Sequence, residues 1–174
     1  KNSKKIKNIS FSEADVTKLP SDLLNKFDVA ITIRCLINLP TWNLQKIAIK
    51  QISNCLKKGG LFFCSEGWDE GMKNLNLERN KVGLQKIKVV KYNKMIKKKE
   101  FENEVKKYFF IKKFESTGFY YLISRLIHPI IKRPKSPKHK DKLNAIASEI
   151  QKKTDLNGAV DYLDPSGVYI LKKK

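Results

Sequence analysis

The stretch KFDVAITIRCLINLP, residues 26–40, decides the fold. Its first half, Phe27 to Ile33, is a near-continuous apolar run that predicts a buried strand of the kind found in parallel sheets. Its second half carries polar side chains, including Arg34 and Asn38. Ligands of open α/β sheets bind at the carboxyl ends of the strands. If the chain forms such a sheet, we expect residues 34–38 to be the lip of a ligand site.

The residues that follow predict a strand–helix–strand unit. Apolar residues recur at three- and four-residue spacing from Leu44 to Leu56, and Thr41 is placed to cap this helix. The KKGG stretch at 57–60 supplies cations for the end of the helix and then glycines that stop it. A further apolar run, LFFCSE at 61–66, follows at once. Short joints between these elements predict parallel strands with a right-handed crossover.

Other patterns predict the elements around this unit. A short strand ending near Ala14 precedes it, and Ser21 is a candidate cap for one helical turn. We favour an extended segment at 85–96. Helices are expected at about 72–81 and 98–108, strands at 108–116 and 168–174, and fraying in the final lysines.

The segment between the last two strands has its own organisation. An apolar helix is expected to break at Pro129, and RPKSPK at 133–138 reads as a loop. A second helix would present Leu143, Ile146, Ala147 and Ile150 on one face. The whole pattern predicts an α/β fold in one domain, residues 1–174, with a helical insertion at about 116–166.

Composition narrows the class of protein. The 174 residues are 41% hydrophobic, with no apolar run of the roughly 18 to 20 residues that a membrane span needs. The first residues lack the apolar core of a secretory signal, and residue 1 is not Met. Three cysteines without a CxxC spacing and only two histidines argue against a disulfide framework and against a metal site. We expect a cytoplasmic protein.

The net charge of +20 has two interpretations. A strongly basic chain suggests nucleic acid or an anionic surface as partner. However, of the 37 Lys and Arg residues only four are Arg, the side chain that recognises phosphate and base edges bidentately. Abundant Lys, Ile and Asn also fit AT-rich coding. Nucleic acid is therefore possible as a partner but not favoured over a small molecule.

The order of three motifs carries a family resemblance. EADVTKLP, then FDVAITIRCLINL, then a helix and LKKGGLFFCSE resemble the second half of a class I S-adenosylmethionine-dependent methyltransferase. The resemblance implies a Rossmann-like sheet with an antiparallel last strand, and S-adenosylmethionine as cofactor. The family's GxGxG loop after its first strand is absent, so the chain resembles an amino-terminally truncated member in which the first strands are missing. More narrowly, SEGW, GMKNLNLERNKVGL and YYLISRLIHP resemble methyltransferases of bacterial polysaccharide and sugar-modification clusters.

The resemblance also implies cofactor-binding residues. Asp15 sits where the family's adenine ligand sits, and the Val16 N–H would donate to a ring nitrogen. Arg34 and Cys35 would lie beside the cofactor at the mouth of the sheet. The alternatives are that Asp15 only stabilises a turn and that Cys35 is a small packing residue, since no neighbour is evident that would activate its thiol.

Five polar residues are candidates for contact with the acceptor: Asn38, Asn76, Arg79, Tyr92 and Arg125. Asn76 and Arg79 are spaced to share one helical face, which could equally be a solvated face. Two residues are candidate catalytic groups. Glu66 ends a strand at the expected crevice, and His128 is a candidate neutral-pH base. The alternatives are an ion pair of Glu66 with Arg34 or Arg79, an ion pair of Arg34 with Asp28, and a hydrogen-bonded core histidine.

We therefore expect methyl transfer to a small polar acceptor, a hydroxyl of a sugar-containing molecule. One rival is an RNA methyltransferase or RNA-binding module, which would bind with steep salt dependence. The other rival is a non-catalytic fragment or scaffold, which the missing glycine loop favours for the chain as given.

Overall fold

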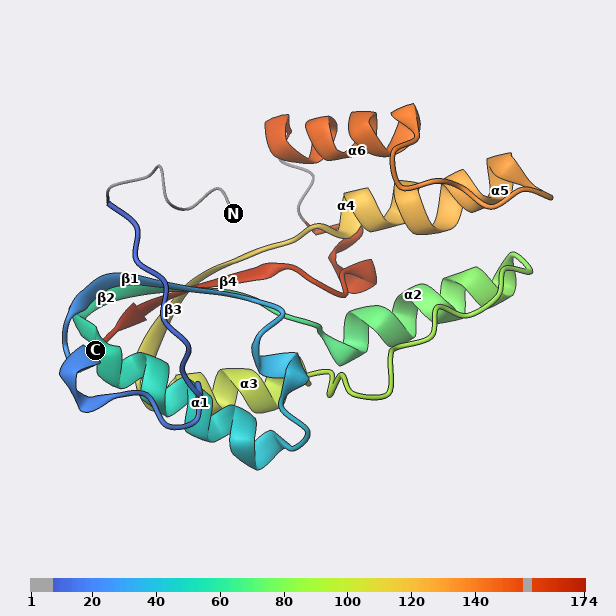
Figure 1. Cartoon of the computed structure of the whole chain (residues 1–174). Coiled ribbons are helices and arrows are strands. Elements are labelled where there is room, and N and C mark those ends of the chain that lie inside the picture. Colours follow the sequence, from blue (N-terminus) through green and yellow to red (C-terminus); the bar gives the residue numbers. More distant parts are fainter. Residues whose placement is uncertain (1–7, 155–157) are drawn as a thin grey trace.

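The structure, a computed structural model, describes residues 8–154 and 158–174. Its centre is a four-stranded mixed sheet in the order β1-β2-β4-β3 (Figure 1). β1 pairs with β2 in parallel, and β4 runs antiparallel to both β2 and β3. The strands are β1 Phe27–Ile33, β2 Leu56–Ser65, β3 Phe109–Glu115 and β4 Val168–Lys173. The predicted α/β fold with an antiparallel last strand is confirmed.

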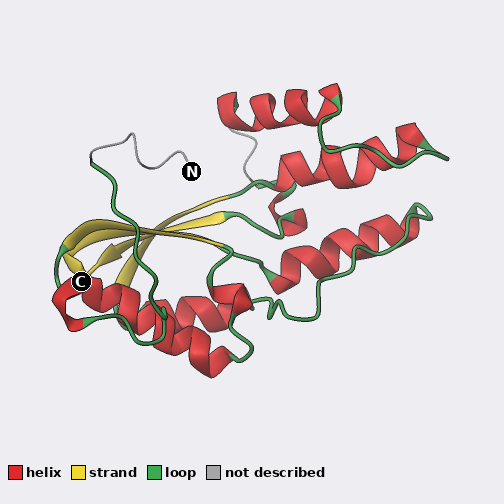
Figure 2. Cartoon of the chain, in the orientation of Figure 1, coloured by secondary structure: helices red, strands yellow, loops and turns green. Residues whose placement is uncertain are grey.

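Helices occupy one face of the sheet and the space beyond one end of it (Figure 2). Short helices η2 (Ser21–Leu23) and η3 (Leu36–Asn38) flank β1. Helices α1 (Trp42–Cys55) and α3 (Lys98–Val105) cover one face. Beyond the carboxyl ends of β1 and β2 lie α2 (Asp69–Lys81), α4 (Gly118–Tyr121), the π-helix η4 (Leu122–Ile127), α5 (His128–Lys132), α6 (Lys142–Lys153) and η5 (Asp161–Leu163).

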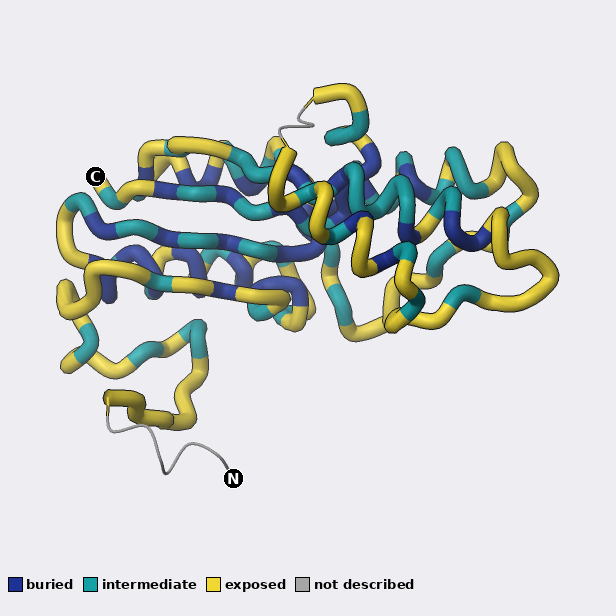
Figure 3. The backbone as a smooth tube through the Cα atoms, turned by 90° about the horizontal axis from the view of Figure 1, so that it is seen from above, coloured by how far each residue is buried: buried dark blue, intermediate teal, exposed yellow. Residues whose placement is uncertain are grey.

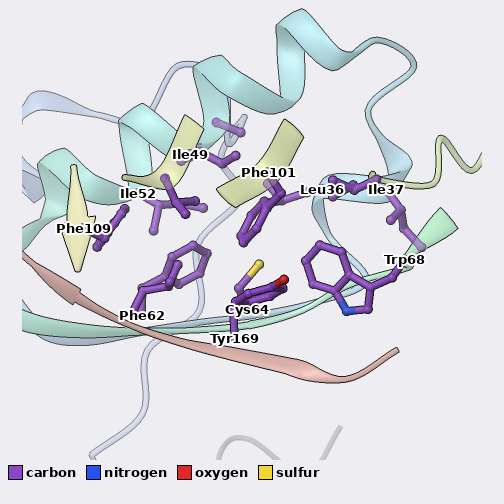
Figure 4. Close-up of a cluster of buried hydrophobic side chains, with 14 of the residues drawn as sticks. Leu36, Ile37, Ile49, Ile52, Phe62, Cys64, Trp68, Phe101, Phe109 and Tyr169 are labelled. Atoms are coloured by element: carbon purple, nitrogen blue, oxygen red, sulfur yellow. The ribbon is translucent and has the colours of Figure 1, made fainter. Parts of the chain in front are cut away.

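The core lies between the sheet and helices α1 and α3 (Figure 4). Trp68 is its centre, with its ring centroid 5.0 Å from those of Phe101 and Tyr169. The Trp68 indole N–H donates to the Gly167 carbonyl at 2.7 Å, so this buried polar group is satisfied. That bond joins the residues after β2 to those before β4, and so it fixes the end of the sheet where the polar lip lies.

The opposite face of the sheet is open along β1 (Figure 3). Val29, Ile31 and Ile33 are 48%, 65% and 72% exposed. The sequence predicted a buried strand, and this part of the prediction is wrong. Alternating residues of β1 point to opposite faces, and in the described chain only the face toward α1 and α3 is covered.

Several predicted element boundaries hold. Thr41 caps α1, its hydroxyl accepting from the Leu44 N–H at 3.3 Å. The helices predicted near 72–81 and 98–108 and the strand predicted at 108–116 correspond to α2, α3 and β3.

Other local predictions are wrong. Residues 9–14 form no strand, and residues 85–96 form only an isolated bridge, between Ile96 and Trp68. Ser21 is the first residue of η2 rather than its cap. Gly59, with φ +80°, lies in a bulge of β2 instead of stopping α1, because β2 already begins at Leu56. Lys172 and Lys173 belong to β4 instead of fraying, and Lys173 Nζ bonds to the Ser53 hydroxyl at 3.0 Å.

Pro129 does not break its helix. The π-helical turn of η4 precedes it, and α5 then continues to Lys132. A proline removes the N–H that would bond the carbonyl four residues earlier, which here belongs to Arg125. The Arg79 guanidinium donates to that carbonyl from α2. The lost helical bond is thus replaced by a tertiary one.

Candidate functional site

The lip of the sheet is an irregular turn with defined hydrogen bonds. Arg34 has φ +53°, a left-handed conformation that is uncommon outside glycine. Its N–H donates to the Ser65 carbonyl at 2.8 Å, and its carbonyl accepts from Asn38 Nδ2 at 2.7 Å. Asn38 therefore supports the turn through its side chain, and contact of Asn38 with an acceptor stays a prediction.

The Glu66 carboxylate stabilises this turn by hydrogen bonds to its backbone. The residue is fully buried, and its two carboxylate oxygens accept from the N–H groups of Cys35 at 3.1 Å and Ile37 at 3.2 Å. Burial raises the pKa of Glu66 above its ordinary value, although these backbone donors oppose the rise. The considered ion pair with Arg34 or Arg79 does not form. Glu66 thus positions the lip, and a role as base stays a prediction.

Cys35 is half-buried beside this carboxylate. Burial, and secondarily the negative charge of Glu66, raises the pKa of the Cys35 thiol. A thiol with a raised pKa is a weak nucleophile at neutral pH. This agrees with its interpretation as a packing residue, and proximity to a cofactor stays a prediction.

Asp15 and Val16 lie in the coil before η2. The Asp15 carboxylate accepts from the Thr17 N–H at 2.8 Å and the Thr17 hydroxyl at 2.7 Å, bonds that lower the Asp15 pKa. Asp15 is exposed, whereas Val16 packs against the core. The turn-stabilising alternative for Asp15 is therefore realised, and binding of adenine stays a prediction.

A cavity of about 260 Å³ lies at the lip of the sheet. It is bounded by the lip, by α2, by the segment 87–95, by the helices after β3 and by the residues before β4. It is lined by Arg34, Met72, Ile87, Lys88, Val89, Val90, Asn93, Met95, Tyr121, Arg125, Pro165 and Ser166. The structure thus brings together two of the predicted residues, Arg34 and Arg125.

Sequence reasoning missed most of the other polar groups of this cavity. Tyr121 and Ser166 form one wall, with 2.8 Å between their hydroxyl oxygens. Asn93 lines the cavity and its buried Oδ1 has no hydrogen-bond partner among the described residues, whereas the predicted Tyr92 is 71% exposed and does not line it. No local pattern marks Ser166, because only the return of the chain before β4 brings it to this site.

The two predicted residues of α2 serve the fold. Asn76 forms a two-point pair with Ile87, donating to its carbonyl at 3.1 Å and accepting from its N–H at 2.7 Å. Arg79 donates to the carbonyls of Gln85 and Arg125. Both residues fix segments that line the cavity, and neither lines it.

His128 lies away from the cavity. It is 1% exposed, and its Nδ1 is 2.9 Å from the Asn144 side-chain oxygen. The Asn144 amide nitrogen donates to two backbone carbonyls, so its oxygen must accept from His128 Nδ1. Nε2 lies 3.1 Å from an Asp141 carboxylate oxygen. The structure thus gives Nδ1 of His128 the partner of a core histidine but leaves Nε2 without a hydrogen bond in the described residues, and its role as base stays a prediction.

The chain supplies only part of a site for S-adenosylmethionine. The implied adenine-side residues, Asp15 and Val16, and the lip at Arg34 are present. The sequence has no GxGxG stretch, and no glycine-rich turn follows a strand in the described residues. Such glycines let the backbone approach a ligand closely. The residues present therefore do not by themselves fit the methionine end of the cofactor.

Comparisons with solved structures show the same fold. The chain is similar to the protein in complex with the Trm112 methyltransferase activator of Haloferax volcanii, with 14% identity, a TM-score of 0.56, and coverage of 96% of this chain and 62% of that chain. The YcgJ protein of Bacillus subtilis is 14% identical with a TM-score of 0.52, and the match covers 99% of this chain and 74% of that chain. The cyclase SpnF is 16% identical with a TM-score of 0.52, and the match covers 94% of this chain and 56% of that chain. The chain thus spans less than two thirds of the cyclase and of the Haloferax protein. No curated protein matches.

These similarities show the fold alone, a Rossmann-like α/β sheet. A sequence profile of the family described as "Methyltransferase domain" matches residues 1–155. The chain belongs to this family, and membership implies S-adenosylmethionine as its cofactor.

Proposed function

We propose that the protein transfers a methyl group from S-adenosylmethionine to a hydroxyl of a small, sugar-containing acceptor. The observation that carries the proposal is the cavity between the lip of the sheet and the helices after β3. It lies at the carboxyl end of the parallel pair, where α/β sheets bind ligands. When bound, S-adenosylmethionine supplies an electrophilic methyl group, so positioning of the acceptor is the main task of the protein.

The chain offers specific groups for this task. The Tyr121 and Ser166 hydroxyls bond to one another at the cavity wall and are placed to orient an acceptor hydroxyl. Burial raises the Tyr121 pKa, which keeps this phenol a neutral donor at physiological pH. Met72, Met95 and Val90 supply apolar surface that excludes water. Neither of the two predicted bases, Glu66 and His128, lines the cavity; Glu66 lies at its edge, because its carboxylate accepts from two amides of the lip.

Further features support the setting of this proposal. Described helices α4–α6 stand between β3 and β4, as the proposed insertion at about 116–166 of a single domain requires. Cys35, Cys55 and Cys64 are free thiols, which fits the reducing cytoplasm that we propose. Among the helices of residues 8–154 and 158–174, none has both the length and the apolar composition of a membrane span. A role in polysaccharide modification rests on the sequence resemblance alone.

Calorimetric titration of S-adenosylhomocysteine tests the proposal. It should be run on this chain and on the longest product of the same reading frame. We expect binding to the longest product, weakened about tenfold by Asp15→Ala if this carboxylate accepts from the adenine amino group. Failure of both proteins to bind would contradict the proposal and favour the scaffold alternative. The test is needed because one fold supports more than one chemistry: the chain is also similar in fold to a cyclase.

RNA modification is a second candidate because of the net charge of +20. It predicts binding of a structured RNA that weakens steeply between low and physiological salt. Weak binding without salt dependence would exclude it.

A further inference from the structure

The four arginines of this lysine-rich chain fall into two groups. Arg79 and Arg133 use their guanidinium groups structurally, donating to backbone carbonyls of Gln85, Arg125 and Val82. The guanidinium groups of Arg34 and Arg125 make no hydrogen bond and no ion pair within residues 8–154 and 158–174. Both of these line the same cavity.

The charge around this cavity is of one sign. Lys88 also lines it, and no Asp or Glu is among its lining residues. The described residues offer no carboxylate within 4.0 Å of these three cations. Like charges around a small space repel one another, and an anion placed among them would relieve that repulsion.

Two acidic residues beside the lining segments, Asp164 and Glu66, already have hydrogen-bond partners. Asp164 is fully buried, and its carboxylate accepts from the Thr117 N–H, the Thr117 hydroxyl and the Ser166 N–H, each at 2.7 or 2.8 Å. Glu66 is likewise buried and bonded to the amides of the lip. The positive charge of Arg125 also acts on Arg79, which does not line the cavity. Burial, and secondarily the charge of Arg125, lowers the pKa of Arg79.

We infer that the acceptor carries an anionic group, a phosphate or a carboxylate, which binds between Arg34 and Arg125 in this cavity. The inference deepens the proposed function. It rests on that function only in taking the bound anion to be the methyl acceptor. Arg is suited to this role because its planar fork binds both anions bidentately, which Lys does not. A volume of about 260 Å³ suits a charged monosaccharide rather than a polymer.

Binding of three simple probes to the chain tests the inference without any cofactor. The probes are glucose 1-phosphate, glucuronate and neutral glucose, titrated by calorimetry or by NMR at low salt. We expect one or both anions to bind and glucose to bind at least about tenfold more weakly, the value of losing one charge-assisted contact. The two anionic arms distinguish a phosphate site from a carboxylate site.

Matched variants locate the site. Arg34→Gln and Arg125→Gln should each weaken anion binding about tenfold, and the Arg→Lys variants should weaken it less. Lys50→Gln, which removes one exposed charge from α1, should leave binding unchanged. Circular dichroism and urea unfolding of each variant establish that it is folded.

Three results would overturn the inference: no binding of either anion, equal binding of glucose, or equal weakening by Lys50→Gln. The outcome is separable from the proposed function. Anion binding without binding of S-adenosylhomocysteine to the longest product would keep the anion site and reject methyl transfer. The converse result would keep the methyltransferase and reject an anionic acceptor.

Discussion

At the scale of single residues, Glu66 shows how a predicted catalytic group can serve the architecture of a site. Its position at the end of β2 was evident from the sequence. Its partners were not, because the two amides that it binds belong to the turn after another strand. A buried carboxylate that accepts from two N–H groups fixes the lip from which Arg34 projects.

The raised pKa of Glu66 predicts a pH dependence of stability. The native state binds the Glu66 proton more tightly than the unfolded state does. Its contribution is therefore complete below the ordinary pKa of 4.5 and is lost as pH rises through the raised pKa. We expect the free energy of unfolding of the wild type, relative to Glu66→Gln, to decrease between about pH 4 and pH 7.

Urea unfolding of both proteins across this range measures the effect. Asp15 and Asp141 have lowered pKa values and act in the opposite direction, but they are present in both proteins and cancel in the difference. A difference between wild type and variant that is constant with pH, or that grows as pH rises, would contradict the assignment.

At the scale of elements, α2 organises the cavity without lining much of it. Asn76 holds the segment after the helix through both backbone groups of Ile87, and Arg79 holds the π-helical turn at Arg125. The sequence predicted that Asn76 and Arg79 share a polar face of this helix. A surface that binds a ligand and a surface that anchors neighbouring segments are both polar. Only the positions of the neighbouring segments distinguish the two.

Removing the Asn76 anchor should destabilise the segment that it holds. Asn76→Ala leaves the N–H and carbonyl of Ile87 without their partner, and we expect a cost of about 1–3 kcal/mol in the free energy of unfolding. Hydrogen exchange at the Ile87 amide should accelerate more than exchange in β2. Asn80→Ala, at an exposed position of the same helix, is the control, and equal effects of the two variants would refute the anchoring role.

Gly71 marks where α2 packs against the residues before β4. A Cβ at this position would lie 1.8 Å from the Asp164 carbonyl oxygen, which is backbone and cannot turn aside. We expect Gly71→Ala to cost about 1–3 kcal/mol or more, as overpacking does. Thermal unfolding measures the loss. Unchanged stability would show that α2 and this segment are less closely packed than the structure indicates.

At the scale of the whole molecule, the covered and open faces of the sheet differ sharply. Helices α1 and α3 bury one face, while apolar side chains of β1 stand exposed on the other. β1 is also an edge strand of the sheet. An exposed apolar edge strand favours association between chains.

We therefore expect this chain to self-associate at micromolar concentrations. Ile31→Lys and Ile33→Lys should reduce the association with little loss of stability, because both side chains are already mostly exposed. Sedimentation velocity across a concentration series measures this. Ile131→Lys is a matched control on α5, since Ile131 is 65% exposed, as Ile31 is. A monomeric wild type, or an equal effect of the control, would contradict the prediction.

The sequence by itself determined the strand–helix–strand unit, the polar lip after Ile33 and the class of fold. These features follow from side-chain periodicity and helix capping, which act over a few residues. It failed for residues 9–14, for 85–96 and at Pro129, where pairing or a distant hydrogen bond decides the conformation.

Only the tertiary structure decided which polar residues meet. Arg34 and Arg125 are far apart in the chain and share one cavity, whereas His128, close to Arg125 in sequence, turns toward α6. The physical reason is that a polar side chain in a folded protein takes whichever partner packing brings within hydrogen-bond distance. That choice depends on how whole elements pack, and no local pattern of residues contains it.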